Sequence, residues 1–184
     1  MNKIKTIFDR NWDGDRKVVN KPLVDPEVLR NAKATEKLDG TNVRITIRNH
    51  TVVRVEKRRN PSKIQKAKGI EEPWYVDADQ YDATDKWIFD GLNHTELLNY
   101  IPDGEWSGEL MGPNVQGNPL NLPTNRIVFF SLDEAPVFEN APVSYEELKA
   151  WLPKQQSKYG HGAIEGIVWH CNDGQMFKIK VKDF

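Results

Sequence analysis

Residues 42–58 restrict the possible folds more than any other stretch of the chain. Residues 42–48 alternate apolar and polar side chains, which is typical of a strand that is buried on one face. Residues 50–58 are again rich in β-branched side chains and follow a short polar turn near Asn49. Two neighbouring strands joined by a short turn predict an antiparallel hairpin, so we expect the sheet to be antiparallel.

The remaining elements predict an α+β fold. We expect helices within residues 24–32, 83–101 and 144–152, and strands within residues 126–132 and 163–184. No internal repeat or flexible linker interrupts the chain, so residues 1–184 are predicted to form a single domain of antiparallel sheets with flanking helices.

The composition is that of a soluble globular protein. The net charge is -1, 38% of the residues are hydrophobic and 29% are charged. No apolar run is long enough to span a membrane, and the N-terminal sequence lacks the apolar core of a secretory signal. Cys171 is the only cysteine, so no internal disulfide can form. These features predict a cytoplasmic protein without a membrane partner.

The charged residues form two opposite blocks. Residues 41–70 contain nine basic residues and one acidic residue, Glu56, whereas residues 71–105 contain ten acidic residues and one basic residue, Lys86. Such blocks are either solvated surfaces or, for the basic one, a surface that follows a phosphate backbone. In the second case we expect nucleic acid to contact Lys63, Lys66 and Lys68.

The final hairpin concentrates positive charge. A two-residue turn at Asp173 and Gly174 would place four side chains on one face of the sheet: Glu165, Lys178, Lys180 and Lys182. An anion such as a triphosphate would suit that face. The alternatives are a lysine face that serves only solubility, and a three-residue turn that changes this register.

A series of short segments adds chemistry to this framework. Along the chain occur, in order, Lys37-Leu38-Asp39-Gly40, Gly108-Glu109, an aromatic strand ending in Leu132-Asp133, Glu165-Gly166 and Lys178-Ile179-Lys180. Together they resemble the five motifs of the covalent nucleotidyltransferases, which include ATP-dependent ligases and mRNA-capping enzymes. Asn42 and residues 108–117 and 177–184 also resemble the phage and RNA-editing branch of the RNA ligases.

This resemblance implies a nucleotidyltransferase (ATP-grasp-like ligase) fold and an ATP-dependent RNA ligase. Lys37 would attack the α-phosphate of ATP and form a lysyl-AMP, which would pass its AMP to a 5′-phosphate before a 3′-hydroxyl seals the RNA. An ordinary lysine has a pKa near ~10.4 and is neutral in only about four molecules per ten thousand at pH 7. A lysine nucleophile therefore needs burial or neighbouring cations, which Lys178 and Lys180 could supply.

The resemblance also implies the other site residues. Asp39 and Gly40 would shape the lysine loop, Glu36 and Phe129 would contact the adenine, and Asn42 and Glu109 would contact the ribose. For Phe129, packing in the core is the competing interpretation. Glu165, together with Glu109, would hold Mg²⁺ or Mn²⁺ with the help of substrate phosphates. Either Arg58 or Arg59 would contact phosphate, and we favour Arg58.

One departure from the family concerns the C-terminus. Ligases of this superfamily generally append an OB-fold or a helical domain after the last motif, and none follows Lys180 here. We therefore expect a catalytic domain that acts as a monomer on nucleic-acid ends, most simply RNA, with an accessory protein as one possible replacement for the missing surface. The alternatives are a minimal ATP-dependent DNA ligase and a catalytically inactive module that binds nucleic-acid ends.

Overall fold

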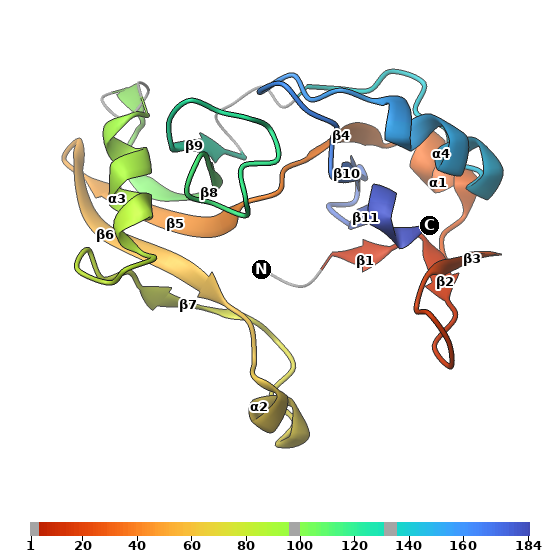
Figure 1. Cartoon of the computed structure of the whole chain (residues 1–184), viewed down its shortest axis with the longest axis horizontal. Helices are drawn as coiled ribbons and strands as arrows, with labels where there is room; N and C mark the ends of the chain where they lie inside the picture. The colour runs from red at the N-terminus through yellow and green to blue at the C-terminus, as the bar shows by residue number, and fades with distance from the viewer. Residues whose placement is uncertain (1–3, 96–99, 131–135) are drawn as a thin grey trace. The chain divides into compact units, whose positions relative to one another are not determined.

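The chain folds into two compact units. The computed structural model describes residues 4–95, 100–130 and 136–184. Among the described residues, unit 1 contains residues 39–95 and 100–130, and unit 2 contains residues 4–38 and 136–184. Unit 1 is thus one continuous stretch, whereas unit 2 is assembled from two stretches that lie far apart in the sequence. The two units are described separately below (Figure 1).

Unit 1 is built on a five-stranded antiparallel sheet. Its strand order is β7-β6-β5-β8-β9, with the strands β5 (Thr41–Arg48), β6 (Thr51–Arg59), β7 (Trp74–Asp77), β8 (Gly104–Met111) and β9 (Arg126–Phe129). The predicted hairpin of β5 and β6 is confirmed, and Val43 pairs with Lys57 in its register. Strand β9 confirms the apolar strand predicted within residues 126–132, of which residues 131 and 132 lie outside the described part of the chain.

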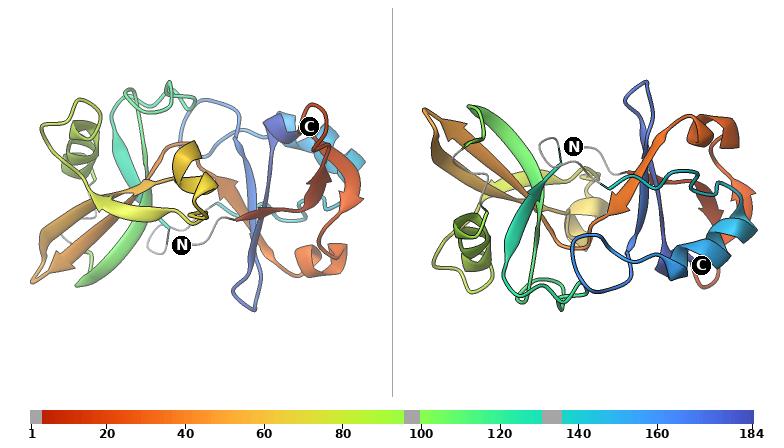
Figure 2. Two further views of the ribbon diagram at one scale, coloured as in Figure 1. Left: turned by 90° about the horizontal axis from the view of Figure 1, so that it is seen from below. Right: turned by 90° about the horizontal axis from the view of Figure 1, so that it is seen from above.

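Two helices belong to unit 1. Helix α3 (Lys86–Asn93) begins within the predicted range of 83–101, and residues 96–99 lie outside the described residues. It packs on one face of the sheet (Figures 1 and 2), where its side chains Ile88 and Leu92 join a buried cluster with Val43, Ile45 and Ile47. Helix α2 (Lys63–Ala67) is a short turn of helix between β6 and β7 with a complete capping box at Ser62 and Gln65. The apolar face of β5 is therefore buried, as predicted, and the structure shows that it packs against α3.

Unit 2 contains a four-stranded sheet. Its strand order is β1-β11-β10-β4, with β1 (Lys5–Thr6), β4 (Lys33–Lys37), β10 (Gly166–His170) and β11 (Met176–Lys180). Strand β10 pairs with β4 and β11 in antiparallel fashion, and β1 adds to β11 in parallel. The strand β10 is the centre of the core, because Ile167 and Trp169 are almost completely buried.

The other elements of unit 2 cover this sheet or extend from it. They are β2 (Phe8–Arg10), β3 (Val18–Pro22), α1 (Pro26–Arg30), α4 (Tyr145–Trp151) and the 3₁₀ turns η2 (Leu152–Lys154) and η3 (Val181–Asp183). Helices α1 and α4 confirm the predictions for residues 24–32 and 144–152, and Asp25 caps α1 by accepting a hydrogen bond from the backbone N–H of Glu27. Arg10 donates to the carboxylate of Asp183 at 2.8 Å, which fastens the β2–β3 hairpin to η3.

The register of the final hairpin differs from the predicted one. The loop has three residues, 172–174, because the N–H of Cys171 donates to the carbonyl of Gln175, and Gly174 adopts a φ of 82°. This conformation suits glycine, and the extra loop residue shifts one strand by one place against the other relative to a two-residue turn. Gly166 therefore faces Lys180 and Val168 faces Lys178. The pairs predicted for a two-residue turn are wrong, and Lys182 lies beyond the strand in η3.

Among the described residues, none of the helices is long and apolar enough to cross a bilayer.

Candidate functional site

The end of strand β4 places Lys37 beside the final hairpin. In the register of the sheet, Lys37 pairs with Gly166, and Gly166 pairs with Lys180 on its other side, so the three residues form one row across the strands. Paired residues project to the same face of a sheet, and Gly166 has no side chain to separate the two lysines. A Cβ atom at Gly166 would lie 2.1 Å from the carbonyl oxygen of Ile179, so the close approach of β11 requires glycine here.

Glu165 joins the two lysines. Its Oε2 accepts a hydrogen bond from Lys37 Nζ, and its Oε1 accepts one from Lys180 Nζ. The backbone carbonyl of Glu165 also accepts a hydrogen bond from the N–H of Val181 at 2.9 Å, which fixes the residue next to the hairpin. Burial alone would raise the pKa of the Glu165 carboxyl, but the hydrogen bonds from Lys180 and Lys37 outweigh burial and lower the pKa below its ordinary value. The carboxylate is therefore ionised at neutral pH.

Lys178 lies in the next row of the same face. It pairs with Val168 on one side and with Thr6 on the other, and within the described residues it has no acidic partner. Burial and the repulsion from Lys180 and Lys37 lower the pKa of Lys178 to about 8. Three ammonium groups thus share one face with a single carboxylate, which is the electrostatic setting of an anion-binding site.

Replacing Lys178 with methionine is expected to stabilise the protein at neutral pH. Because the pKa of Lys178 falls from 10.5 to about 8 on folding, the charged form is disfavoured in the folded state. The resulting penalty is complete below pH 8 and disappears as the pH rises toward 10.5. Thermal unfolding should therefore show a Tm several degrees above that of the parent at pH 7 and a smaller difference at pH 9.5.

The control for this comparison is Lys182→Met, which removes an exposed lysine from η3. It should leave the Tm close to that of the parent at both pH values. A Lys178→Met protein that is no more stable than the parent at pH 7 would contradict the half-buried, unpaired state of this ammonium.

In unit 1, Asn42 and Glu109 form a second polar group. They face each other across β5 and β8, and the Asn42 amide Nδ2 lies 3.5 Å from Glu109 Oε2 and 3.3 Å from the carbonyl of Gly108. The hydroxyl of Tyr75 donates to Asn42 Oδ1 at 2.6 Å and lies 3.4 Å from Ser107 Oγ. Tyr75 therefore fixes which way the amide points, and its NH₂ group is directed to the Glu109 carboxylate. Sequence reasoning missed Tyr75, because it lies 33 residues from Asn42 and belongs to no recognised motif.

The strand register places the side chains of Arg58 and Arg59 on opposite faces of the unit 1 sheet. Arg58 pairs with Tyr75 and so lies on the same face as Asn42, whereas Arg59 pairs with Trp74 and lies on the opposite face. The Nε atom of Arg58 is buried and has no hydrogen-bond partner among the described residues, which leaves it free for an anionic ligand. The phosphate contact of Arg58 stays a prediction, and of the two arginines Arg58 is the one that shares a face with Asn42.

Some of the basic side chains of residues 41–70 are already paired with carboxylates. Arg44 makes two hydrogen bonds to Glu56, Arg54 pairs with Asp77, and Lys57 pairs with Asp85. Within the described residues, no acidic partner is found for a second set, which consists of Arg58, Arg59, Lys63, Lys66 and Lys68. This second set retains positive charge for a partner, and so does Arg48 at the other end of the block, whose printed hydrogen bond goes to the carbonyl of Ile47.

Two residues that were predicted to contact the adenine are buried, and one predicted motif lies outside the described residues. Phe129 is completely buried in the apolar cluster and faces Gly108, so it packs in the core and its predicted stacking on adenine is corrected. Glu36 is buried on the opposite face of its sheet from Lys37 and accepts a hydrogen bond from the N–H of Lys158 at 3.3 Å. Burial raises the pKa of its carboxyl. The segment Leu132-Asp133 lies outside the described residues.

Asp39 and Gly40 follow Lys37 at the start of unit 1. A Cβ atom at Gly40 would lie 2.0 Å from the carbonyl oxygen of Leu110, so only glycine allows β5 to start this close to β8. Asp39 is half-buried and stands directly before this tight approach. The structure thus shows why glycine is required at position 40, and the predicted role of the pair in shaping the lysine loop stays a prediction.

No preformed metal centre is present in the described part of the chain. It contains no cluster of three or more His, Cys, Asp or Glu side chains with the geometry to hold an ion. Both oxygens of Glu165 contact lysines, and Glu109 contacts Asn42. A divalent cation here would need a carboxylate together with oxygen ligands brought by the substrate, which is a common arrangement for Mg²⁺.

Comparison with protein families gives a match over the second half of the chain. Residues 100–184 match the family model described as RNA ligase 1. The RNA ligase 1 of Danio rerio is 38% identical over 74 residues, which are 39% of this chain and 22% of that protein. The RNA ligase 1 of Rattus norvegicus is 35% identical over 74 residues, with the same shares of both chains. The matched part therefore spans about a fifth of the length of these relatives.

Solved structures share the fold over nearly the whole chain. An RNA ligase of Naegleria gruberi with PPi superposes with a TM-score of 0.55 at 15% identity, covering 99% of this chain and 59% of that one. A variant of the same ligase with AMP and Mn superposes with a TM-score of 0.52 at 16% identity, covering 97% of this chain and 56% of that one. At these identities the comparison establishes the fold, and this chain spans less than two thirds of those structures.

Proposed function

We propose that this chain, which has the fold of an RNA ligase catalytic domain, is an ATP-dependent RNA ligase that works through a lysyl-AMP intermediate. The observation that carries the proposal is the arrangement of Lys37, Glu165, Lys178 and Lys180 on one face of the unit 2 sheet. A single carboxylate orients two ammonium groups, and the third is left unpaired for an anion. The match to the RNA ligase 1 family supports RNA as the substrate.

In the proposed reaction, the deprotonated Nζ of Lys37 attacks the α-phosphorus of ATP. The new P–N bond forms as the bond to pyrophosphate breaks, and the product is a phosphoramidate of Lys37. Lys178 and Lys180 would neutralise the charge of the phosphate, and Glu165 would hold the Lys37 side chain in position before the attack. The 5′-phosphate of RNA then displaces Lys37 from the AMP, and a 3′-hydroxyl finally displaces AMP to form the phosphodiester.

Residues of unit 1 are proposed to hold the nucleoside and its phosphates. The Glu109 carboxylate accepts hydrogen bonds and the Asn42 amide donates them, so the pair suits the hydroxyl groups of a ribose. The guanidinium of Arg58 would contact a phosphate, with its free Nε as one of the donors. Glu165 would supply the protein oxygen for Mg²⁺ or Mn²⁺, with Glu109 as a second candidate, and the ion would neutralise phosphate charge when bound. The solved Naegleria structure with AMP and Mn supports this choice of ligands.

Incubation with ATP that is radiolabelled at the α-phosphate tests the proposal. With Mg²⁺ or Mn²⁺ present, the parent protein should acquire label that survives denaturation and is released by added pyrophosphate. RNA with 5′-phosphate and 3′-hydroxyl ends should then be sealed faster than the corresponding DNA. Absence of labelling would contradict the proposal and favour an end-binding module, and preferential sealing of DNA would favour a DNA ligase.

Replacing Tyr75 with phenylalanine is expected to weaken the recognition of the ribose. The change removes the hydroxyl group that fixes the Asn42 amide, without removing the ring on which Arg44 is stacked at 4.4 Å. The preference for ATP over 2′-deoxy-ATP in lysyl-AMP formation should fall by about 3- to 10-fold, which is the size of one hydrogen bond. The measurement is the ratio of kcat/KM for the two nucleotides.

The matched control is Tyr81→Phe, since Tyr81 is exposed and its ring lies outside this network. It should keep the nucleotide preference of the parent. If Tyr75→Phe also keeps that preference while labelling normally, Tyr75 does not position the ribose contact.

A further inference from the structure

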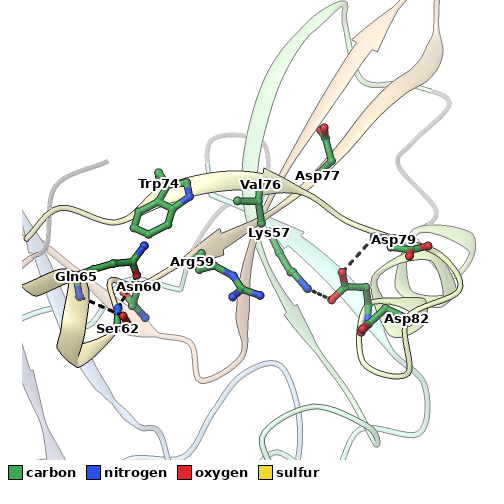
Figure 3. Close-up of a pocket in the computed structure, with 11 residues that line it drawn as sticks. Lys57, Arg59, Asn60, Ser62, Gln65, Trp74, Val76, Asp77, Asp79 and Asp82 are labelled. Atoms are coloured by element: carbon green, nitrogen blue, oxygen red, sulfur yellow. Dashed lines mark hydrogen bonds and ion pairs between the residues drawn. The ribbon is translucent and has the colours of Figure 1, made fainter. Parts of the chain in front are cut away.

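We propose that a pocket on the face of the unit 1 sheet opposite Asn42 and Glu109 binds one unpaired nucleotide of the RNA substrate. Strands β6 and β7, helix α2 and the loop before α3 enclose a cavity of 480 Å³ (Figure 3). This volume lies within the range of about 300–1,000 Å³ that is typical of small-ligand sites. The inference rests on the proposed ligase function, because that function supplies the RNA, and it adds a site that is separate from the nucleotidyl-transfer residues.

The walls of the pocket follow from the strand register. Arg59 pairs with Trp74, and Lys57 pairs with Val76, so all four side chains project to the same face. Figure 3 shows the guanidinium of Arg59 between the indole of Trp74 and the ammonium of Lys57. The indole is half-buried, which leaves part of its surface open to the cavity. An aromatic ring beside a guanidinium is the usual platform for a stacked base and its phosphate.

The two ends of the pocket differ in charge, and the Arg59 end is the positive one. Lys57 is neutralised by Asp85, whereas Arg59 has no acidic partner among the described residues. The amide side chain of Gln65 and the hydroxyl of Ser62 lie at the Arg59 end, and the unpaired Lys63 and Lys66 belong to the same helix α2. This end suits a phosphate, with further phosphates of the strand along α2.

The other end of the pocket offers hydrogen-bond acceptors. Asp79 Oδ1 accepts from the N–H of Tyr81, and Asp82 Oδ1 accepts from Thr84 and Asp85, while the second oxygen of each carboxylate makes no hydrogen bond within the described structure. Free carboxylate oxygens would repel a phosphate but suit the hydroxyl groups of a ribose. The pocket therefore matches a ribonucleotide whose phosphate lies at Arg59 and whose sugar faces the aspartates.

The pocket does not compete with the ribose contact proposed above. Lys57 pairs with Val43, whereas Asn42 is the next residue along β5 and its side chain points to the other face of the same sheet. Asn42 and Glu109 thus lie on one face and Arg59 and Trp74 on the other. A nucleotide in each site would be separated by the sheet itself.

The binding of a short fluorescein-labelled single-stranded RNA, followed by anisotropy, tests the inference. Trp74→Leu keeps an apolar side chain but removes the aromatic surface, and it should raise the Kd by about 10-fold. Arg59→Ala should raise the Kd several-fold and reduce its dependence on salt. Lysyl-AMP formation without RNA should stay at the parent rate in both variants, since neither residue lies on the face of Asn42 and Glu109.

Two matched controls lie outside the pocket in the same unit. Tyr81→Leu removes an aromatic ring that is 87% exposed, and Arg48→Ala removes an arginine at the far end of β5. Both should bind RNA like the parent. Arg59→Ala alters an exposed side chain, so an unchanged affinity of this variant for RNA would overturn the inference. The inference would also be overturned if Trp74→Leu lost RNA binding and lysyl-AMP formation to the same extent. A parent protein that neither labels with ATP nor binds RNA would instead contradict the proposed function.

Discussion

Replacing Lys37 with arginine is expected to reduce the formation of protein-bound AMP to background. Arginine keeps the positive charge that contacts Glu165, but its guanidinium stays protonated at any accessible pH and cannot act as the nucleophile. The variant therefore separates the chemical role of the amine from its role in the ion pair. The measurement is the transfer of label from ATP to protein, together with the Tm, which should stay within a few degrees of the parent.

The same variant allows a second measurement that is specific to the proposed sequence of steps. RNA that already carries AMP on its 5′-phosphate does not need Lys37 as a nucleophile, so Lys37→Arg should still seal it. Lys33→Arg, on the same strand but exposed at its other end, is the matched control and should label normally. Labelling of Lys37→Arg at the parent rate would exclude Lys37 as the attachment point of AMP.

Replacing Glu165 with glutamine is expected to slow lysyl-AMP formation on the order of 100-fold or more. The side chain of Glu165 is 8% exposed, and each of its oxygens accepts a hydrogen bond from one lysine. An amide has only one acceptor oxygen, and its NH₂ group would face the second ammonium, so one of the two lysines would lose its partner. Breaking a buried charged pair in this way costs about 3–5 kcal/mol.

The pH dependence of stability provides a second measurement on Glu165→Gln. Because the pKa of Glu165 is lowered on folding, its ionised form stabilises the parent above the ordinary pKa of 4.5, and this contribution is lost as the pH falls through the lowered value. The variant should lack this contribution, so the Tm difference from the parent should shrink in acid. Glu146→Gln, an exposed carboxylate on α4, should behave like the parent. Full labelling activity of Glu165→Gln would remove the carboxylate from the mechanism.

The fold was predictable where periodicity and turn chemistry agree. The β5–β6 hairpin, helix α1 with its Asp25 cap and helix α4 all carry local signals, and all are confirmed. Strand β4 gave no such signal, because its sequence, Lys-Ala-Thr-Glu-Lys, is rich in charged residues and becomes a strand only through pairing with β10. Tertiary pairing overrides local preference most easily in short strands.

The candidate site was predictable in its residues but not in its geometry. The motifs correctly grouped Lys37 with Glu165 and Lys180, yet the assumed two-residue turn placed Lys180 opposite Ile167 and not Gly166. One added loop residue changes every pair, and the sequence around Gly174 allows either loop. The contact of Phe129 with adenine was predicted wrongly because the sequence pattern of an apolar strand does not show whether an aromatic ring faces a ligand or the core.

The path of the chain through the two units has a consequence for biosynthesis. The described residues of unit 1 all belong to the segment 39–134, so this segment can fold as soon as it has emerged from the ribosome. Strand β4 is made before that segment, whereas its partner β10 and the next strand of the sheet, β11, are made after it. More than a hundred residues are therefore synthesised after Lys37 before Glu165 and Lys180 exist, so we expect the proposed lysyl-AMP to form only after translation has passed residue 180.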